Sequence, residues 1–294
     1  MQKGFRTGLP TKTERLAAGR GLREKIKRGE LGRWRPKSDR LRGEIERSAN
    51  LARNQTSDRA LPKLTRERDG DRRMVEQPPL VTLVSDDEKD RIIDRLEAYL
   101  TTLLQRWRRV LGSYLVVEVA HKLVGVGSVG LRAFVVLQGN GSEDMLFLQL
   151  KQSRRSCVAP FVHGDTAWHA HQGQPVVEYQ QTPQKVCDPL LGWTTVDKRD
   201  YYVRHFRDMK GAPTVEGIDG CGLMDYGRIC GALLAKGDAR LADPAILTGY
   251  LGNGDASDRA FARFACGCAD QTEADHHALQ QAIRAGRLPA EPGV

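Results

Sequence analysis

The sequence has no long apolar run. None of its 294 residues belongs to a stretch approaching the roughly 18 apolar residues that a membrane-spanning helix needs. The N-terminus also lacks the apolar core that follows the positive charges of a secretory signal. We therefore expect a cytoplasmic protein that has no membrane partner.

Cysteine pairs of the kind that hold disulfides or metals are also missing. The chain has 6 cysteines, none in a C-x-x-C pair, and so few in a chain of this length do not form a disulfide framework. Cys266 and Cys268 are too close in sequence for the usual zinc spacing. Residues 270–277 mix carboxylates with imidazoles, but a solvated acidic helix face is the commoner use of such a segment. We predict no metal site.

Aromatic residues are scarce in the first quarter of the chain, and basic residues are in excess. Residues 1–73 hold 22 Lys and Arg against 10 Asp and Glu, whereas the remainder holds 24 against 27. Prolines interrupt this part, so we expect residues 1–79 to be a basic, largely irregular N-terminal arm with short helices at 13–28 and 38–54. Such an arm favours an acidic partner or the phosphate backbone of a nucleic acid; the alternative is a solvated arm with no dedicated partner.

The most informative stretch is residues 124–151. It opens with a G-x-G-x-x-G pattern at 125–130, which two different phosphate-binding structures use. Residues 131–137 are rich in β-branched and aromatic side chains, which predicts a strand rather than the helix of a dinucleotide-binding fold. Asn140-Gly141 predicts a hairpin turn, and a second apolar run ends at Lys151.

This order of strand, glycine loop, strand, turn, strand and lysine is typical of a kinase-type phosphate lid. The glycines let backbone N–H groups approach a phosphate, and the lysine neutralises its charge. A glutamate from the next helix normally holds that lysine. The alternative is a plain β-meander with glycine-rich turns. The candidate nucleotide-binding residues are Gly125, Gly127, Ser128, Gly130 and Lys151, with Glu178 as the partner of Lys151.

The rest of the pattern indicates an α+β protein. Residues 85–88 fit a capping box, and apolar residues from Ile92 to Trp107 predict one amphipathic helix of about six turns. Residues 193–206 predict a hairpin. We expect a kinase-like antiparallel sheet with helices over residues 80–211, followed by a helical C-terminal part over 212–294.

Several blocks of the chain resemble one known family. From about residue 52 to 288 the sequence resembles the bacterial domain of unknown function 2252, in blocks at 60–65, 121–132, 146–151, 201–211, 249–252 and 269–279. The resemblance implies a distant relationship to protein kinases and aminoglycoside phosphotransferases. It therefore implies ATP with Mg²⁺ as the cofactors to consider.

The departures from that family concern catalysis. Its members carry a segment resembling C-G-D-A-H-x-x-N-F-G, followed by D-x-N-D-F-D, which looks like a kinase catalytic loop; residues 1–60 contain neither. Asp165 lacks the asparagine that should follow it, Asp225 falls inside a helical pattern, and Asp238 stands where the family has histidine.

We therefore expect a degenerate kinase-like protein that keeps part of a nucleotide site, lacks the catalytic segment and has no identifiable catalytic residues. Two alternatives stay open. One is a non-catalytic interaction protein that uses the basic arm. The other is an active phosphotransferase completed by a partner.

Overall fold

The computed structural model describes two compact units of the chain. The described residues are 38–53, 57–68, 71–123, 125, 130–140, 144–162, 169–184, 187–206, 212–214 and 218–290, without the side chains of 57–60, 71 and 162. One unit spans residues 35–227, and the other combines 1–34 with 228–294. Most of the predicted basic arm, including the helix expected at 13–28, lies outside the described residues. The domain boundaries stay a prediction.

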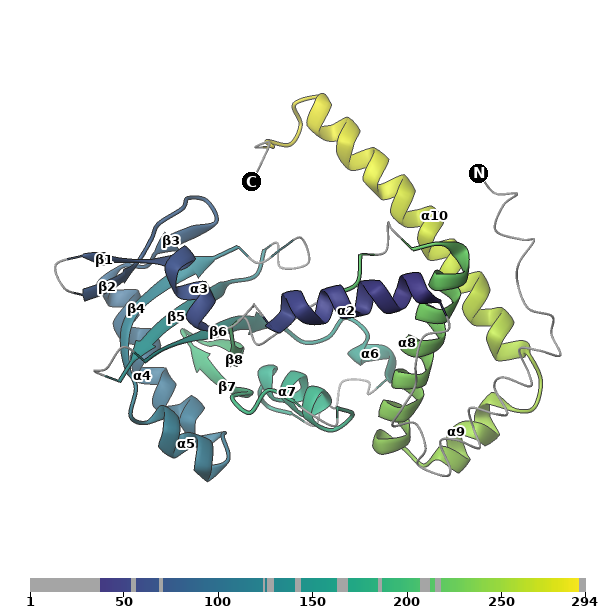
Figure 1. Cartoon of the computed structure of the whole chain (residues 1–294), viewed down its shortest axis with the longest axis horizontal. Helices are drawn as coiled ribbons and strands as arrows, with labels where there is room; N and C mark the ends of the chain where they lie inside the picture. Colours follow the sequence, from purple (N-terminus) through teal and green to yellow (C-terminus); the bar gives the residue numbers. More distant parts are fainter. Residues whose placement is uncertain are drawn as a thin grey trace. The chain divides into compact units, whose positions relative to one another are not determined.

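A six-stranded antiparallel sheet organises the larger unit (Figure 1). Its spatial order is β3-β4-β5-β6-β8-β7. The bounds are β3 Val81–Leu83, β4 Leu115–Lys122, β5 Ala133–Gly139, β6 Met145–Ser153, β7 Gly192–Val196 and β8 Arg199–His205. The strands predicted on both sides of the glycine pattern are β4, β5 and β6, and each pairs with the next as a hairpin neighbour.

Apolar packing covers the central strands on both faces. Side chains alternate between faces along a strand, so Phe134, Val136, Leu148 and Leu150 share one face, which packs against helix α4 (Asp86–Thr101). The opposite face packs against helix α3 (Ser57–Leu64). Every residue of β5 is buried, as expected for a strand with an apolar layer on each side. Each face of the sheet has its own cluster of buried apolar side chains. The α4-side cluster includes Ile92, Leu96, Tyr99, Leu148, Leu150 and Val203, and the α3-side cluster includes Leu61, Leu64, Val135, Leu137, Phe147 and Phe206.

The helix predicted to run through Trp107 is in fact two helices. Helix α4 ends at Thr101, and helix α5 spans Gln105–Leu111. Arg108 stabilises the end of α4. Its Nε and Nη2 donate to the carbonyl oxygens of Leu100 and Thr101 at 2.9 and 2.7 Å. These are end carbonyls with no partner inside the helix, and a cation near them also suits the helix dipole. The apolar periodicity continues across the break and conceals it in the sequence.

The predicted hairpin over 193–206 is confirmed as β7 and β8. Its turn residues Asp197 and Lys198 have φ of 48° and 60°. Positive φ at both central positions is the geometry of a type I′ turn, whose twist matches that of antiparallel strands.

The remaining elements surround the sheet or form the C-terminal part. The larger unit also holds α2 (Asp39–Arg53), the β1–β2 hairpin (Thr65–Arg68 and Asp71–Met74), α6 (Ala159–Val162) and α7 (Gly173–Gln181). Helix α8 (Gly220–Leu241) begins in that unit, and the second unit holds α9 (Pro244–Leu251) and α10 (Ala256–Arg284). The predicted α+β class with a helical C-terminal part is confirmed. Among the described residues no helix is long and apolar enough to cross a membrane.

Two glycines give a matched test of this packing. A Cβ on Gly192 would lie 2.3 Å from Thr102 Oγ1 and 2.8 Å from the buried Tyr99 ring. We expect Gly192→Ala to cost about 1–3 kcal/mol of unfolding free energy, because the α4 layer must move. Gly43 lies inside α2 with nothing within 4 Å of the same position. Gly43→Ala should instead stabilise by about 0.5–1 kcal/mol. Denaturant unfolding of both variants measures the two changes in unfolding free energy. A Gly192→Ala protein as stable as the parent would contradict the packing.

Candidate phosphate-binding site

Lys151 lies near the end of strand β6, beside the end of the glycine turn. We use that name for residues 123–132, which connect β4 to β5. Lys151 pairs with Ala133 on one side and with Tyr202 on the other. Paired Cα atoms in such a ladder are about 4.5–5.5 Å apart, so Lys151 is one strand spacing from the residue that follows the glycine turn. The alternation of side chains places Lys151 on the same face as Phe147, opposite to α4.

Two glycines of the turn adopt backbone angles that favour glycine. Gly125 has φ of 104° and Gly130 has φ of 77°. Nothing lies within 4 Å of a Cβ built on either residue, so the reason for glycine is the backbone conformation and not close packing. Gly127 and Ser128, also predicted to bind nucleotide, lie outside the described residues.

The end of the glycine turn is fastened to the strand that carries Lys151. Gln152 N–H donates to the carbonyl of Arg132 at 2.9 Å, and Arg132 N–H donates to Gln152 Oε1 at 3.0 Å. The side chain of Arg154 donates to the carbonyl of Gly130 at 3.3 Å. The structure therefore brings Gly130 and Lys151, two of the predicted residues, to one end of the sheet.

A second cation, which sequence reasoning missed, lies beside Lys151. Arg204 sits on β8 opposite Gln149, two residues along from Tyr202, the partner of Lys151. Lys151 and Arg204 are thus diagonal neighbours on one face, a spacing of about 7–8 Å. The sequence signal that could have found it is the alternation of apolar and polar residues in 199–205. This alternation puts Arg204 on the face opposite to the buried Tyr201 and Val203.

Burial and the proximity of Arg204 make the protonated form of Lys151 less favourable. Burial, and then the nearby Arg204 guanidinium, lower the pKa of the Lys151 ammonium. No carboxylate of the described residues lies within ion-pair distance of Lys151. Arg204 Nε is buried and has no hydrogen-bond acceptor among the described atoms. An anion bound here would offset both costs.

The structure does not bring the predicted partner, Glu178, to Lys151. Glu178 lies on α7, and its carboxylate accepts from Gln174 Nε2 at 2.8 Å and contacts His169 Nε2 at 2.7 Å. These contacts, with Gln174 contributing more than His169, lower the pKa of Glu178 against the opposing effect of burial. The hydrogen-bond partners of this carboxylate are therefore Gln174, on the same helix, and His169, just before that helix, and not Lys151. Its role in binding stays a prediction.

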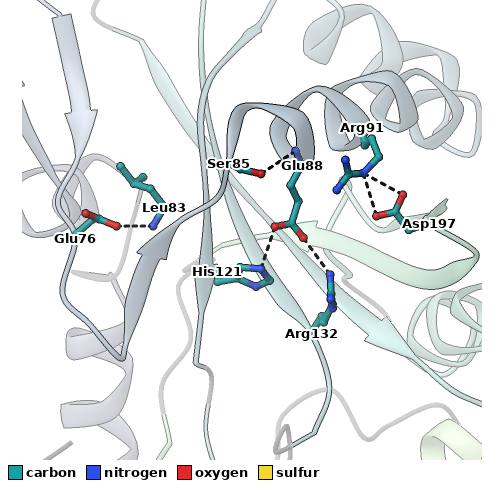
Figure 2. A network of polar contacts seen from close by, with 8 residues as sticks. All are labelled: Glu76, Leu83, Ser85, Glu88, Arg91, His121, Arg132 and Asp197. Atoms are coloured by element: carbon teal, nitrogen blue, oxygen red, sulfur yellow. Dashed lines mark hydrogen bonds and ion pairs between the residues drawn. The ribbon is translucent and has the colours of Figure 1, made fainter.

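Glu88 contacts His121 on β4 and Arg132, the last residue of the glycine turn (Figure 2). It sits in the first turn of α4, where its N–H donates to the Ser85 hydroxyl at 3.3 Å, as the predicted capping box requires. In a full capping box the Glu88 carboxylate would also accept from the backbone N–H of Ser85, but here it makes other contacts. Instead Oε2 lies 3.4 Å from His121 Nε2, and Oε1 accepts from Arg132 Nη1 at 3.0 Å.

Residues 22–282 match the family described as an uncharacterized protein conserved in bacteria, DUF2252. The chain belongs to this family. No curated protein and no solved structure matches this DUF2252 chain. The family assignment agrees with the resemblance found in the sequence and carries no activity with it.

The half-buried charge of Lys151 predicts a pH-dependent effect on stability. Its pKa is lowered in the folded state, so the unfolded state binds the proton more tightly. The protonated amine therefore costs stability below the folded pKa. That cost fades as the pH rises toward the ordinary lysine pKa and is absent above it. We expect Lys151→Met to raise the melting temperature by about 2 °C at neutral pH.

The gain should shrink in melting curves recorded above the ordinary lysine pKa. Lys63, exposed near the end of α3, is the control, and Lys63→Met should show no such pH-dependent gain. A Lys151→Met protein that melts below the parent at neutral pH would contradict the argument.

Proposed function

We propose that this DUF2252 chain binds the phosphate groups of a nucleotide such as ATP, in the manner of a kinase small lobe. The observation that carries the proposal is the position of Lys151. It is half-buried, has no carboxylate partner among the described residues, and lies one strand from Ala133, the residue that follows the glycine turn. A phosphate held between the turn's N–H groups and Lys151 would supply the missing negative charge.

The order of elements around Lys151 supports the kinase-like part of the proposal. The glycine turn joins the antiparallel neighbours β4 and β5, and Lys151 follows on β6. After the short helix α6, α7 precedes β7 and β8 in the chain. Helix α7 lies on the Lys151 side of the sheet, since Asp200, on that face, accepts from Gln172 N–H at 2.8 Å. Kinases place a glycine-rich loop, a strand lysine and a helix glutamate in this sequence.

The described side chains fit a nucleotide phosphate better than they fit a protein-held metal. Lys151 and Arg204 place two cations on one face of the sheet. Arg204 also forms a hydrogen bond with the hydroxyl of Tyr202, two residues before it on β8. No group of three His, Cys, Asp or Glu that could hold a metal ion occurs among the described residues. Mg²⁺, if it accompanies the nucleotide, would be held largely by the phosphates themselves, as is common for this ion.

The proposal includes binding without phosphoryl transfer. Phosphoryl transfer needs an aspartate that orients the acceptor, with Asn or Asp side chains that hold the metal. Of the three aspartates considered from the sequence, Asp225 is buried in α8 and accepts from the backbone N–H of Ser38 at 2.9 Å. That contact gives it a structural use. Asp238 is exposed on the same helix, and Asp165 lies outside the described residues.

Nucleotide binding is tested by calorimetric titration of the chain with ATP, with and without Mg²⁺. We expect Lys151→Ala to weaken binding by about 1–3 kcal/mol, the scale of a lost charge-assisted hydrogen bond, or about 5- to 150-fold in Kd. Lys198→Asn is the matched control. It removes a lysine from the β7–β8 turn and keeps a residue type that tolerates positive φ. Absence of ATP binding by the parent chain, or equal loss in both variants, would overturn the proposal.

Turnover is tested separately. The purified chain should show no appreciable ATPase or phosphotransferase activity with Mg²⁺, because positioning and charge neutralisation supply nearly all of the catalysis in phosphoryl transfer. ATP hydrolysis that disappears in Asp165→Asn or Asp238→Asn would make that aspartate the catalytic one and would disprove this part of the proposal.

A further inference from the structure

Strand β7 is the last strand at one edge of the six-stranded sheet, where β8 pairs with it on one side. Thr195 lies opposite Asp200 in this pair, and Trp193 lies opposite Tyr202. The backbone N–H of Trp193 points away from β8, because it donates to the Thr102 hydroxyl at 3.3 Å. Alternate residues of an antiparallel strand point their backbone groups to the same side. The N–H and the carbonyl of Thr195 therefore also point away from β8, toward the edge.

This edge is closed at Trp193 and open at Thr195. Thr102, the C-cap of α4, accepts the outward N–H of Trp193. In the described part of the chain, the outward backbone groups of Thr195 have no hydrogen-bond partner. The β7–β8 turn begins two residues further on, at Asp197. Unpaired backbone groups at a sheet edge are a template for another chain. Because the open length is one residue, it suits a short segment and not a full extra strand.

A cleft of about 330 Å³ lies beside the open residue. This volume is at the lower end of the range of about 300–1,000 Å³ that is usual for ligand sites. Three of the lining residues stand three and four positions apart on α4 and so share one helix face, and the other three belong to β7 and its turn. The lining residues are Arg91, Asp94, Arg95, Thr195, Asp197 and Lys198.

The unpaired charge of the cleft is positive. Asp197 accepts from Arg91 Nε at 3.2 Å, so these two charges offset each other, as Figure 2 shows. The other charged groups that line the cleft are two cations, Arg95 and Lys198, and one anion, Asp94. Within the described ranges, none of these three side chains makes a hydrogen bond or an ion pair. A carboxylate is the complementary group, since a guanidinium can donate two parallel hydrogen bonds to it.

We propose that this edge binds a short, extended peptide segment that carries a carboxylate side chain. The residue of the segment opposite Thr195 exchanges two backbone hydrogen bonds with it, as a closely paired antiparallel residue does. Side chains alternate along the segment, so the neighbours of that residue point to the α4 face. Thr194 points the same way, and its hydroxyl donates to the Arg95 carbonyl at 2.7 Å. A Glu or Asp at the neighbouring position therefore meets Arg95.

This peptide site is independent of the proposed nucleotide binding. Strand β8 separates β7 from β6, the strand that carries Lys151. The cleft lies along α4, whereas Lys151 is on the opposite face of the sheet. Failure of either proposal therefore leaves the other standing.

The charge requirement is tested with two blocked peptides. The probe is acetyl-Val-Glu-Thr-Glu-Val-amide, whose β-branched residues favour an extended chain and whose sequence reads the same in both directions. The control peptide has Gln in place of both Glu and keeps the backbone. Binding is followed by backbone amide NMR of the full chain. We expect the Glu peptide to bind about 10-fold more tightly than the Gln peptide, and Arg95→Gln to remove most of that difference.

The backbone requirement is tested with two substitutions of one residue. Thr195→Pro removes the outward N–H, and proline is accepted in an edge strand where the N–H is unpaired. Thr195→Val keeps that N–H. Both variants lose the hydrogen bond from the Thr195 hydroxyl to Asp200 at 2.9 Å, so Thr195→Val is the matched control. We expect about 10-fold weaker binding of the Glu peptide to Thr195→Pro and a change of less than about 2-fold for Thr195→Val.

A measurement on the parent chain covers the case in which Thr195→Pro fails to fold. The Glu peptide should slow hydrogen exchange of the Thr195 amide, because that N–H becomes hydrogen-bonded in the complex. Equal weakening by Thr195→Pro and Thr195→Val, or unchanged exchange at Thr195, would overturn the proposal. So would equal affinity for the two peptides, or no amide shift with the Glu peptide at about 1 mM, a concentration that reveals weak binding. Free glutamate that shifts the same amides as strongly would show a site for small carboxylates and would also overturn it.

Discussion

Burial of strands β5 and β6 from both sides is the constraint on which the rest of the larger unit depends. Helix α4 covers one face and α3 the other, so the central strands carry apolar side chains in both directions. The apolar α3-side layer extends to Phe147, and Gln149 and Lys151 then continue the same face of β6. A charged lysine is therefore placed at the margin of a core and not in open solvent. Its proximity to the glycine turn follows from the antiparallel pairing of β5 with β6.

The sequence predicted the local parts of this arrangement. Apolar runs rich in β-branched and aromatic residues, separated by glycine or Asn-Gly, predicted β4, β5 and β6. The turn that begins at Asp197 predicted the β7–β8 hairpin. The capping residue Ser85 predicted the start of α4. These signals are local, because a strand or a helix start depends on residues a few positions apart.

The contacts of the candidate site depended on residues far apart, and sequence reasoning did not find them. Arg204 is distant in sequence from Lys151 and becomes its neighbour through the pairing of β6 with β8. Glu88 fitted a capping box, a pattern that says nothing of His121 or Arg132 across the fold. Glu178 was assigned to Lys151 by chain order alone, and the nearer His169 and Gln174 take its carboxylate. The end of α4 depended on Arg108 folding back, which apolar periodicity does not report.

The environment of Lys151 has a consequence for its covalent chemistry. Burial and the Arg204 guanidinium lower its pKa, so a larger share of its amine is uncharged at neutral pH than for an exposed lysine. An uncharged amine has a free electron pair and is a nucleophile toward carbonyl groups. The same two cations would draw in an anionic molecule. An anion that also carries an aldehyde or an activated acyl group would thus meet an amine that is uncharged more often than that of an exposed lysine.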